Sequence, residues 1–225
     1  MKGVTLTLAG LSRRFNGRAV LDALDLQLSA GEAAVLFGPS GCGKSTLLRL
    51  IAGLDEPDAG TIAIGGTAVS APGRLLPPWL RGCGLLFQSD ALWPHLTIEE
   101  QVGRVAAASC DALPEKCWRD IGATLGISSL WKRHPGDLSG GEARRVALLR
   151  SLAASPSLLL LDEPLAHLDD ESGHRVLDVL HAWHADAKST LLMVSHESSL
   201  LADWPARRLH LERLMLGQGS GNRPD

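Results

Sequence analysis

The chain has 225 residues, of which 45% are hydrophobic and 21% charged, and its formal net charge is −3. This length and composition suit one sizeable globular domain. The small negative charge gives no indication of a nucleic acid as the main partner. No stretch approaches the roughly 18 unbroken apolar residues that a membrane-spanning helix needs.

The start of the chain and its cysteines indicate the compartment. Residues 1–10 alternate apolar and polar side chains and lack the apolar core of a secretory signal. We therefore expect the protein to remain in the cytoplasm, where thiols are normally reduced. The cysteines form no CxxC pair and have irregular spacing, so they predict no metal framework: Cys42, Cys83, Cys110 and Cys117.

The first part of the chain predicts strands and one helix. The predicted strands share alternating or uniformly apolar side chains and cover 4–8, 24–28, 33–37, 61–64 and 84–87. A helix is predicted over 44–52, after a glycine-rich turn, and Gly53 can end it.

From residue 89 to about 155 the pattern becomes helical. Thr97 and Glu100 have the spacing of a capping box before one helix. Pro114 predicts the start of a second helix that runs to about residue 125, and 142–154 predicts a third. Strands at 158–161, 190–194 and 207–211 and a helix at 171–187 are predicted to follow.

This order of elements predicts the fold class. Strands and helices alternate at both ends, which predicts an α/β core with a mainly parallel sheet and an inserted helical block. We expect a single domain over 1–225. Its predicted parts are an α/β core from 1–88 and 156–216, a helical subdomain from 89–155, and a disordered tail from 217–225.

A phosphate-binding loop is predicted between the strand at 33–37 and the helix at 44–52. The match to GxxxxGK[ST] lies between a strand and a helix, which raises its specificity. Glycines let backbone N–H groups point at phosphate oxygens, and the helix adds its positive dipole end. Lys44 should reach the β- and γ-phosphates, and the Ser45 hydroxyl should bind Mg²⁺. The predicted nucleotide-binding residues here are Gly38, Pro39, Ser40, Gly41, Cys42, Gly43, Lys44, Ser45 and Thr46.

Two adjacent carboxylates follow the apolar run at 158–161. Asp162 and Glu163 stand at the carboxyl end of a predicted parallel strand, where ligands of α/β sheets bind. Asp162 is expected to hold Mg²⁺, and Glu163 to polarise an attacking water. A Glu at this point favours a hydrolase over a passive binder.

Further motifs resemble those of the ATP-binding cassette (ABC) family. Gln88 resembles its Q-loop glutamine, Asp169 its D-loop aspartate, and His196 its switch histidine; Phe15 resembles the aromatic residue that stacks on adenine. The stretch that resembles the family's signature is Leu138-Ser139-Gly140-Gly141-Glu142. These motifs appear in the family's order over 15–196, so the resemblance covers nearly the whole chain.

The resemblance implies a P-loop NTPase core with an N-terminal antiparallel β subdomain and an inserted helical subdomain. It also implies a dimer in which two subunits sandwich two ATP molecules. The signature of one subunit, including Ser139, Gly140, Gly141 and Glu142, would then face the P-loop of the other. Asp169 would lie at the seam between the subunits.

The same resemblance assigns roles at the reacting end of the nucleotide. Glu163, His196 and Gln88 are the catalytic candidates, with His196 on the γ-phosphate and Gln88 touching Mg²⁺ or water. Ser45, Gln88 and Asp162 are the expected Mg²⁺ ligands.

The implied function is ATP hydrolysis that energises an ABC transporter. The run at 92–97, and a chain that ends soon after the core, look most like small-solute importers of bacteria. The implied partners are a second copy in a head-to-tail dimer, integral membrane subunits and a solute-binding protein, with no nucleic acid. The chain would then be a peripheral protein on the cytoplasmic face of the inner or plasma membrane. The alternatives are an ABC ATPase outside transport, a P-loop protein of another class such as a kinase, and a regulatory ATP-binding module.

Three positions depart from the family pattern. Glu142 replaces the usual Gln of the signature, where we expect a tuning effect and retained activity. His167 replaces a common Ala before the D-loop, and Cys42 lies inside the P-loop, where thiol reagents could block ATP.

Two other features allow more than one interpretation. His174, His181 and His184 fall on one face of a predicted helix, which is either a metal site or, more simply, a solvated helix face. Trp93 is either a contact for a membrane partner or a core tryptophan.

Overall fold

The computed structural model describes residues 3–109, 111–196 and 199–215. One set of strands comprises β1 (Leu6–Phe15), β2 (Arg18–Leu28), β4 (Ala59–Ile64), β5 (Thr67–Ala71) and β6 (Arg74–Leu75). A second set comprises β3 (Ala33–Phe37), β7 (Cys83–Leu86), β8 (Leu158–Asp162), β9 (Thr190–Val194) and β10 (Arg207–His210). The helices are α1 (Lys44–Ala52), α2 (Ile98–Ala107), α3 (Glu115–Thr124), α4 (Gly140–Ala153), α5 (Asp170–Ala187) and α6 (Leu211–Met215). Single 3-10 turns cover Pro78–Leu80, Ser128–Leu130 and Pro135–Asp137.

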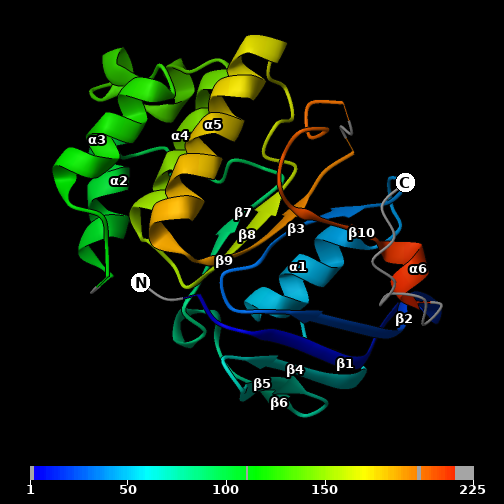
Figure 1. Cartoon of the computed structure of the whole chain (residues 1–225). Helices are drawn as coiled ribbons and strands as arrows, with labels where there is room; N and C mark the ends of the chain where they lie inside the picture. The colour runs from blue at the N-terminus through cyan, green and yellow to red at the C-terminus, as the bar shows by residue number, and fades with distance from the viewer. Residues whose placement is uncertain (1–2, 110, 197–198, 216–225) are drawn as a thin grey trace.

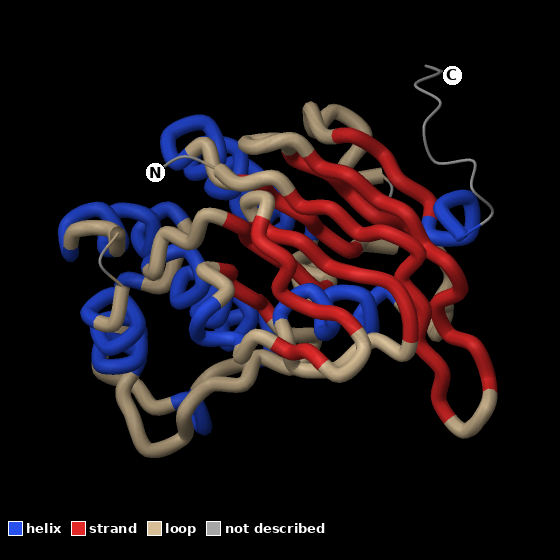
Figure 2. Tube along the Cα trace, turned by 90° about the horizontal axis from the view of Figure 1, so that it is seen from below, coloured by secondary structure: helices blue, strands red, loops and turns tan. Residues whose placement is uncertain are grey.

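The two sets of strands form two sheets of five strands each (Figure 1). The first is antiparallel, has the order β2-β1-β4-β5-β6, and is seen from below in Figure 2. The second has the order β10-β3-β9-β8-β7, and all of its pairs are parallel. The predicted α/β class, with its parallel core and N-terminal antiparallel strands, is confirmed.

Helix α1 lies between the two sheets (Figure 1). Its leucines at 47, 48 and 50 are buried in one cluster with side chains of both sheets, such as Leu26 of β2 and Leu160 of β8. Each fully buried leucine contributes about 2 kcal/mol. The sandwich therefore fixes α1, and the loop before it, against the parallel sheet.

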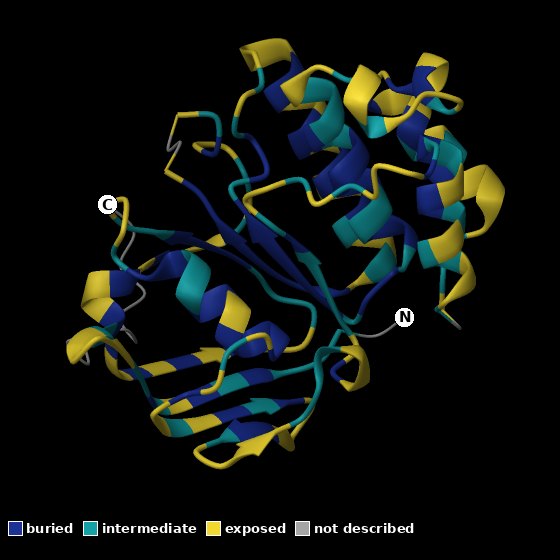
Figure 3. Cartoon of the chain, turned by 180° about the vertical axis from the view of Figure 1, so that it is seen from behind, coloured by how far each residue is buried: buried dark blue, intermediate teal, exposed yellow. Residues whose placement is uncertain are grey.

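The other face of the parallel sheet packs against α4 and α5, in a second cluster. Leu158 and Leu160 belong to the α1 cluster, whereas Leu159 and Leu161 belong to the second. Successive side chains of a strand point to opposite faces, so a sheet covered on both faces needs apolar residues throughout. Figure 3 shows the resulting band of buried strands between partly exposed helices.

Most predicted elements are found within one or two residues of their expected bounds. Helix α1 covers 44–52 as predicted, and Gly53 ends it in the left-handed region with φ of +81°. Thr97 and Glu100 form the predicted capping box at the start of α2. Helices α2, α3 and α4 lie between β7 and β8, where the helical block was expected; the division into subdomains stays a prediction.

Some expectations were wrong at the ends of strands. Strand β7 ends at Leu86, one residue before the predicted end at 87, so Gln88 lies two residues into the following loop. Strand β10 ends at His210, because residues 211, 214 and 215 are apolar with the spacing of a helix and form α6. The short strands β5 and β6 were not predicted, since their small and polar residues carry no clear alternation. The predicted tail at 217–225 lies outside the described residues.

No helix in the residues that the structure describes is both long and apolar enough to cross a membrane.

Candidate functional site

Four of the predicted site features gather at the carboxyl edge of the parallel sheet, whereas Phe15, the signature segment and Asp169 lie on other elements. The P-loop follows β3, His196 follows β9, Asp162 ends β8, and Gln88 lies two residues beyond β7. These four strands are neighbours in the order β3-β9-β8-β7. Because parallel strands end at the same edge, residues far apart in the sequence come together there, in the position typical of ligand sites in α/β sheets.

The P-loop is curled around the ammonium of Lys44. Gly41 and Gly43 have φ of +77° and +108°, a region that favours glycine. The buried Lys44 donates through Nζ to the carbonyls of Gly38 at 2.7 Å and Pro39 at 2.9 Å. Gly43 occupies the N-cap of α1 and offers no side-chain cap to its first N–H groups. These N–H groups and the positive helix end suit an anion such as a phosphate.

Asp162 and Ser45 line one pocket next to this loop. The pocket has a volume of about 420 Å³ and also includes Gln88 and Arg49. Burial raises the pKa of Asp162, the charge of Glu163 adds to this, and a hydrogen bond with Ser45 lowers it.

One oxygen of this buried carboxyl group is unsatisfied. Oδ1 of Asp162 has no hydrogen-bond partner in the part of the chain that the structure describes. A buried acceptor without a donor is costly. Carboxylate, hydroxyl and amide oxygens are the ligands that hard cations prefer, so Asp162, Ser45 and Gln88 fit a site for Mg²⁺.

Glu163 adopts an unusual backbone conformation beside His196. Its φ of +52° lies in the left-handed region, which costs a residue with a Cβ about 1–2 kcal/mol. Its N–H donates to the carbonyl of Val194 on β9 at 2.9 Å. Its Oε1 lies 3.2 Å from Nδ1 of His196, whose side chain is 55% exposed. The pair can therefore orient a water and accept its proton at the mouth of the site.

The signature segment begins α4 with a capping box. Ser139 Oγ accepts from the N–H of Glu142 at 3.3 Å, and the Glu142 carboxylate accepts from the N–H of Ser139 at 2.8 Å. The bond from the Ser139 N–H lowers the pKa of the Glu142 carboxyl group most, and a bond with the Ser139 side chain lowers it further. The acid at this position thus supports the helix start, and its carboxylate is directed at backbone.

The D-loop aspartate also begins a helix. Asp169 caps α5 and accepts from the N–H of Ser172 at 2.8 Å. A Cβ on Gly141 would lie 3.4 Å from the carbonyl oxygen of His167, so the starts of α4 and α5 are neighbours. His167 itself is exposed and has φ of +64°.

Phe15 lies at the end of β1 and is 43% exposed. The guanidinium carbon of Arg13 is 4.7 Å from its ring centroid. Such a cation–π contact stiffens the ring. The predicted stacking of Phe15 on adenine stays a prediction.

The remaining candidates have identifiable surroundings. His184 Nε2 lies 3.1 Å from the carbonyl oxygen of Gly31, and burial lowers the pKa of this histidine. Among the described residues, no group of three or more His, Cys, Asp or Glu side chains is placed to hold a metal ion. Trp93 is 39% exposed, with Arg150 over its ring at 5.2 Å, so it is neither a core residue nor a free surface residue.

Sequence reasoning missed Arg144, a buried arginine behind the carboxylate pair. A signal was available, because Arg144 shares a helix face with Ala147 and Leu148 at spacings of three and four residues. A charge on an otherwise apolar face requires buried partners.

Comparison with known protein families gives the affiliation of the chain. The family model described as "ABC transporter" matches residues 21–166, well over half of the sequence. The chain belongs to the ABC transporter family. The matched span of this ABC transporter chain contains the P-loop, Gln88, the signature and the carboxylate pair, whereas Phe15, Asp169 and His196 lie outside it.

Individual relatives of this ABC transporter chain are about two fifths identical to it over the aligned residues. An ATP-binding protein of Brucella abortus is 39% identical over 194 residues, which are 85% of the chain and 54% of the relative. An Fe(3+) ions import ATP-binding protein of Streptomyces avermitilis is 40% identical over 204 residues, which are 88% of the chain and 58% of the relative. A sulfate/thiosulfate import ATP-binding protein of Chromobacterium violaceum is 40% identical over 193 residues, which are 85% of the chain and 52% of the relative. The chain thus spans about half the length of the curated relatives it matches.

Proposed function

We propose that this chain binds and hydrolyses ATP to energise an ABC transporter, and that the transporter is a bacterial small-solute importer. The observation that carries the proposal is the sheet edge where the Lys44 loop, the unsatisfied Asp162 oxygen and the Glu163–His196 contact adjoin one another. The names of the relatives, several of which are import ATP-binding proteins, support the importer.

The residues of the edge divide the work. Lys44 and the N–H groups at the start of α1 bind the β- and γ-phosphates. Asp162, Ser45 and Gln88 hold Mg²⁺, which neutralises phosphate charge when bound. Glu163 orients a water and takes its proton, and His196 contacts both Glu163 and the γ-phosphate. Because Glu163 is held in one backbone conformation, its carboxylate is positioned before the water arrives.

The chain acts as a head-to-tail dimer of two copies. Ser139 and Gly140 are exposed at the start of α4 and face the nucleotide of the second copy. Asp169, at the neighbouring start of α5, lies at the seam. The partners are integral membrane subunits and a solute-binding protein, and the chain is a peripheral protein on the cytoplasmic face of the membrane. The relatives' names cover iron, sulfate and glycerol phosphate, so we propose small-solute import as a class.

The test is Mg-ATP hydrolysis by the purified chain, with wild type beside Glu163→Gln. The variant keeps the size of the side chain and loses its basicity, so we expect turnover to fall by about a hundredfold or more. If the wild type is inactive alone, the assay is repeated with candidate membrane subunits in lipid. Nucleotide binding without hydrolysis in both settings would support the regulatory module and refute the ATPase.

A further inference from the structure

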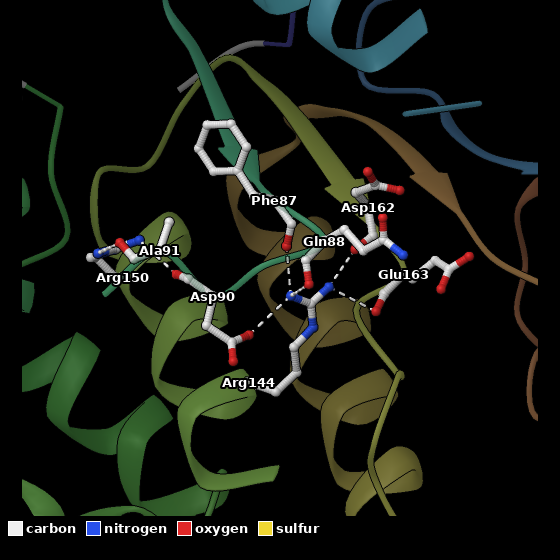
Figure 4. Close-up of polar contacts among 8 residues, drawn as sticks. All are labelled: Phe87, Gln88, Asp90, Ala91, Arg144, Arg150, Asp162 and Glu163. Carbon is white, nitrogen blue, oxygen red and sulfur yellow. Dashed lines mark hydrogen bonds and ion pairs between the residues drawn. The ribbon is translucent and has the colours of Figure 1, made fainter. Parts of the chain in front are cut away.

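Arg144 connects the loop after β7 to the helical segment. Its side chain is 2% exposed and extends from α4 behind the sheet edge (Figure 4). Nη1 donates to the carbonyl of Phe87 at 2.6 Å and approaches the carbonyl of Gln88 at 3.3 Å. The same nitrogen lies 3.1 Å from Oδ1 of Asp90, a carboxylate partner. One end of the guanidinium thus fixes the backbone that carries the Q-loop glutamine.

The other end of the guanidinium holds the carboxylate pair. Nη2 donates to the carbonyl of Asp162, and to that of Glu163 at 2.8 Å (Figure 4). Both bonds are to backbone, so the Asp162 and Glu163 carboxylates stay available to ligands. Arg144 therefore joins two loops of the site that lie about 75 residues apart in sequence, as the numbering shows.

This arrangement explains why an arginine is tolerated inside the protein. A buried guanidinium is costly unless its N–H groups are satisfied. Here the planar fork offers Nη1 and Nη2 in fixed geometry, one for each loop, whereas Nε is buried without a partner among the described residues. A lysine ammonium is a single point and reaches only one of the two loops at a time.

The conformation of Glu163 needs such support. A non-glycine residue in the left-handed region persists only where its surroundings hold it there. Its N–H donates to the carbonyl of Val194 on β9, and its carbonyl accepts from Arg144 on α4. The backbone on the two sides of Glu163, a corner in the chain, is therefore bonded to two different elements. The direction of the Glu163 carboxylate toward His196 depends on that corner.

We propose that Arg144 is a positioning residue that fixes the carboxylate pair relative to Gln88 and couples both to α4. The proposal deepens the proposed ATPase function and rests on it. Since α4 begins with the signature segment, a shift of α4 moves the Q-loop backbone and Glu163 together.

Arg150, which lies further along α4 toward its carboxyl end, provides a matched control. It donates to the carbonyls of Ala91 at 2.9 Å and Asp90 at 3.1 Å, and it lies over the ring of Trp93. It thus bonds to the loop after β7, and among the described residues none of its hydrogen bonds goes to the carboxylate pair.

The experiment compares wild type, Arg144→Lys and Arg150→Lys by amide hydrogen exchange and by ATP turnover. In Arg144→Lys we expect exchange to rise by about threefold or more in both 87–91 and 162–168. We expect kcat to fall about tenfold while KM for ATP stays within about twofold, because the P-loop is untouched. In Arg150→Lys exchange rises only in the loop near 90–93, and kcat stays within about twofold.

A second variant covers the case in which Arg144→Lys fails to fold. Asp90→Asn removes the charged partner that helps to orient the Arg144 guanidinium, so the guanidinium should hold the carbonyls of Asp162 and Glu163 less firmly. We expect exchange at 162–168 to rise, although Asp90 makes no bond there in Figure 4. Unchanged exchange at 162–168 in the folded variants, or kcat and KM changing in proportion, would overturn the proposal. A wild type that is inactive both alone and with candidate membrane subunits in lipid would refute the ATPase instead, because the exchange measurement does not depend on hydrolysis.

Discussion

The side chains of the site already make hydrogen bonds within the chain, and a ligand must replace these bonds or add to them. The ammonium of Lys44 is buried and already donates hydrogen bonds to two carbonyls of its own loop. Its charge is therefore satisfied without a ligand, and the loop is shaped before an anion arrives. Cys42, in the same loop, is half-buried, and a Cβ on Gly38 would come within 2.8 Å of its Sγ.

Removing the ammonium should weaken nucleotide binding. For Lys44→Ala we expect ATP affinity to fall about tenfold or more, since a charge-assisted hydrogen bond contributes about 1.5–3 kcal/mol. Isothermal titration calorimetry measures this. The exposed Lys132 supplies a control in Lys132→Ala, which should bind ATP like wild type. Equal ATP affinities in the two variants would show that Lys44 does not bind the phosphates.

The thiol of Cys42 should report occupancy of the loop. We expect ATP to slow its alkylation by iodoacetamide about fivefold or more, because a ligand in the loop restricts access to the thiol. The exposed Cys117 serves as an internal standard, whose rate ATP should leave alone. Peptide mass spectrometry resolves the two sites. If Cys42 reacts at one rate with and without ATP, phosphate binds elsewhere.

At the scale of elements, acidic side chains take part in the N-terminal caps of three helices. Glu100, Glu142 and Asp169 belong to the caps of α2, α4 and α5, and each accepts a hydrogen bond from a backbone N–H. The largest cause of the lowered pKa is the backbone bond from Thr97 for Glu100, from Ser139 for Glu142 and from Ser172 for Asp169. Protonation removes the charge that strengthens these backbone bonds, so acid should loosen these helix starts.

The sign of the pH dependence follows from the lowered pKa of Glu142. Its contribution to the free energy of unfolding is complete above the ordinary carboxyl pKa of about 4.3, and is lost as pH falls through the lower folded-state value. Urea unfolding followed by tryptophan fluorescence should show stability decreasing below that pH. Glu142→Gln retains an acceptor without titrating, so its loss on acidification should be smaller.

Between pH 6 and 7 the difference between Glu142→Gln and wild type should not depend on pH, because Glu142 is charged in both folded and unfolded states. Parallel curves at all pH values would show that the Glu142–Ser139 bond is not present in solution.

At the scale of the whole molecule, the two sheets share one helix and leave one edge for ligands. Helix α1 is buried between the sheets, and α4 and α5 cover the opposite face. The P-loop therefore opens at the sheet edge, while the exposed Ser139 and Gly140 start a helix on the other cluster. This separation suits a site that a second copy completes.

A catalytic block should therefore trap a dimer. We expect Glu163→Gln to elute as a dimer on gel filtration with Mg-ATP and as a monomer without it, because in the proposed dimer bound ATP joins the P-loop of one copy to the signature of the other. The double variant Lys44→Ala/Glu163→Gln should remain monomeric under the same conditions. A Glu163→Gln chain that binds ATP and stays monomeric would contradict the sandwich arrangement.

The sequence alone determined what depends on local rules. Helix α1 and its glycine end follow from apolar spacing and one left-handed residue, and the capping box of Thr97 and Glu100 from hydrogen bonds within one turn. The P-loop and the acid pair were identified because their residue types and flanking elements suffice to predict an anion cradle and a strand end.

Only the tertiary structure decided which of these features meet. The order β3-β9-β8-β7, which brings the P-loop, His196, Asp162 and Gln88 to one edge, depends on hydrogen bonds between distant strands. The conformation of Glu163 and the bonds of Arg144 were equally inaccessible, because they depend on carbonyls from three separate segments: the loop after β7, the end of β8 and Val194 on β9. The spacing of apolar residues indicates which face of a helix or strand is buried, whereas the element that covers this face depends on the packing of the whole chain.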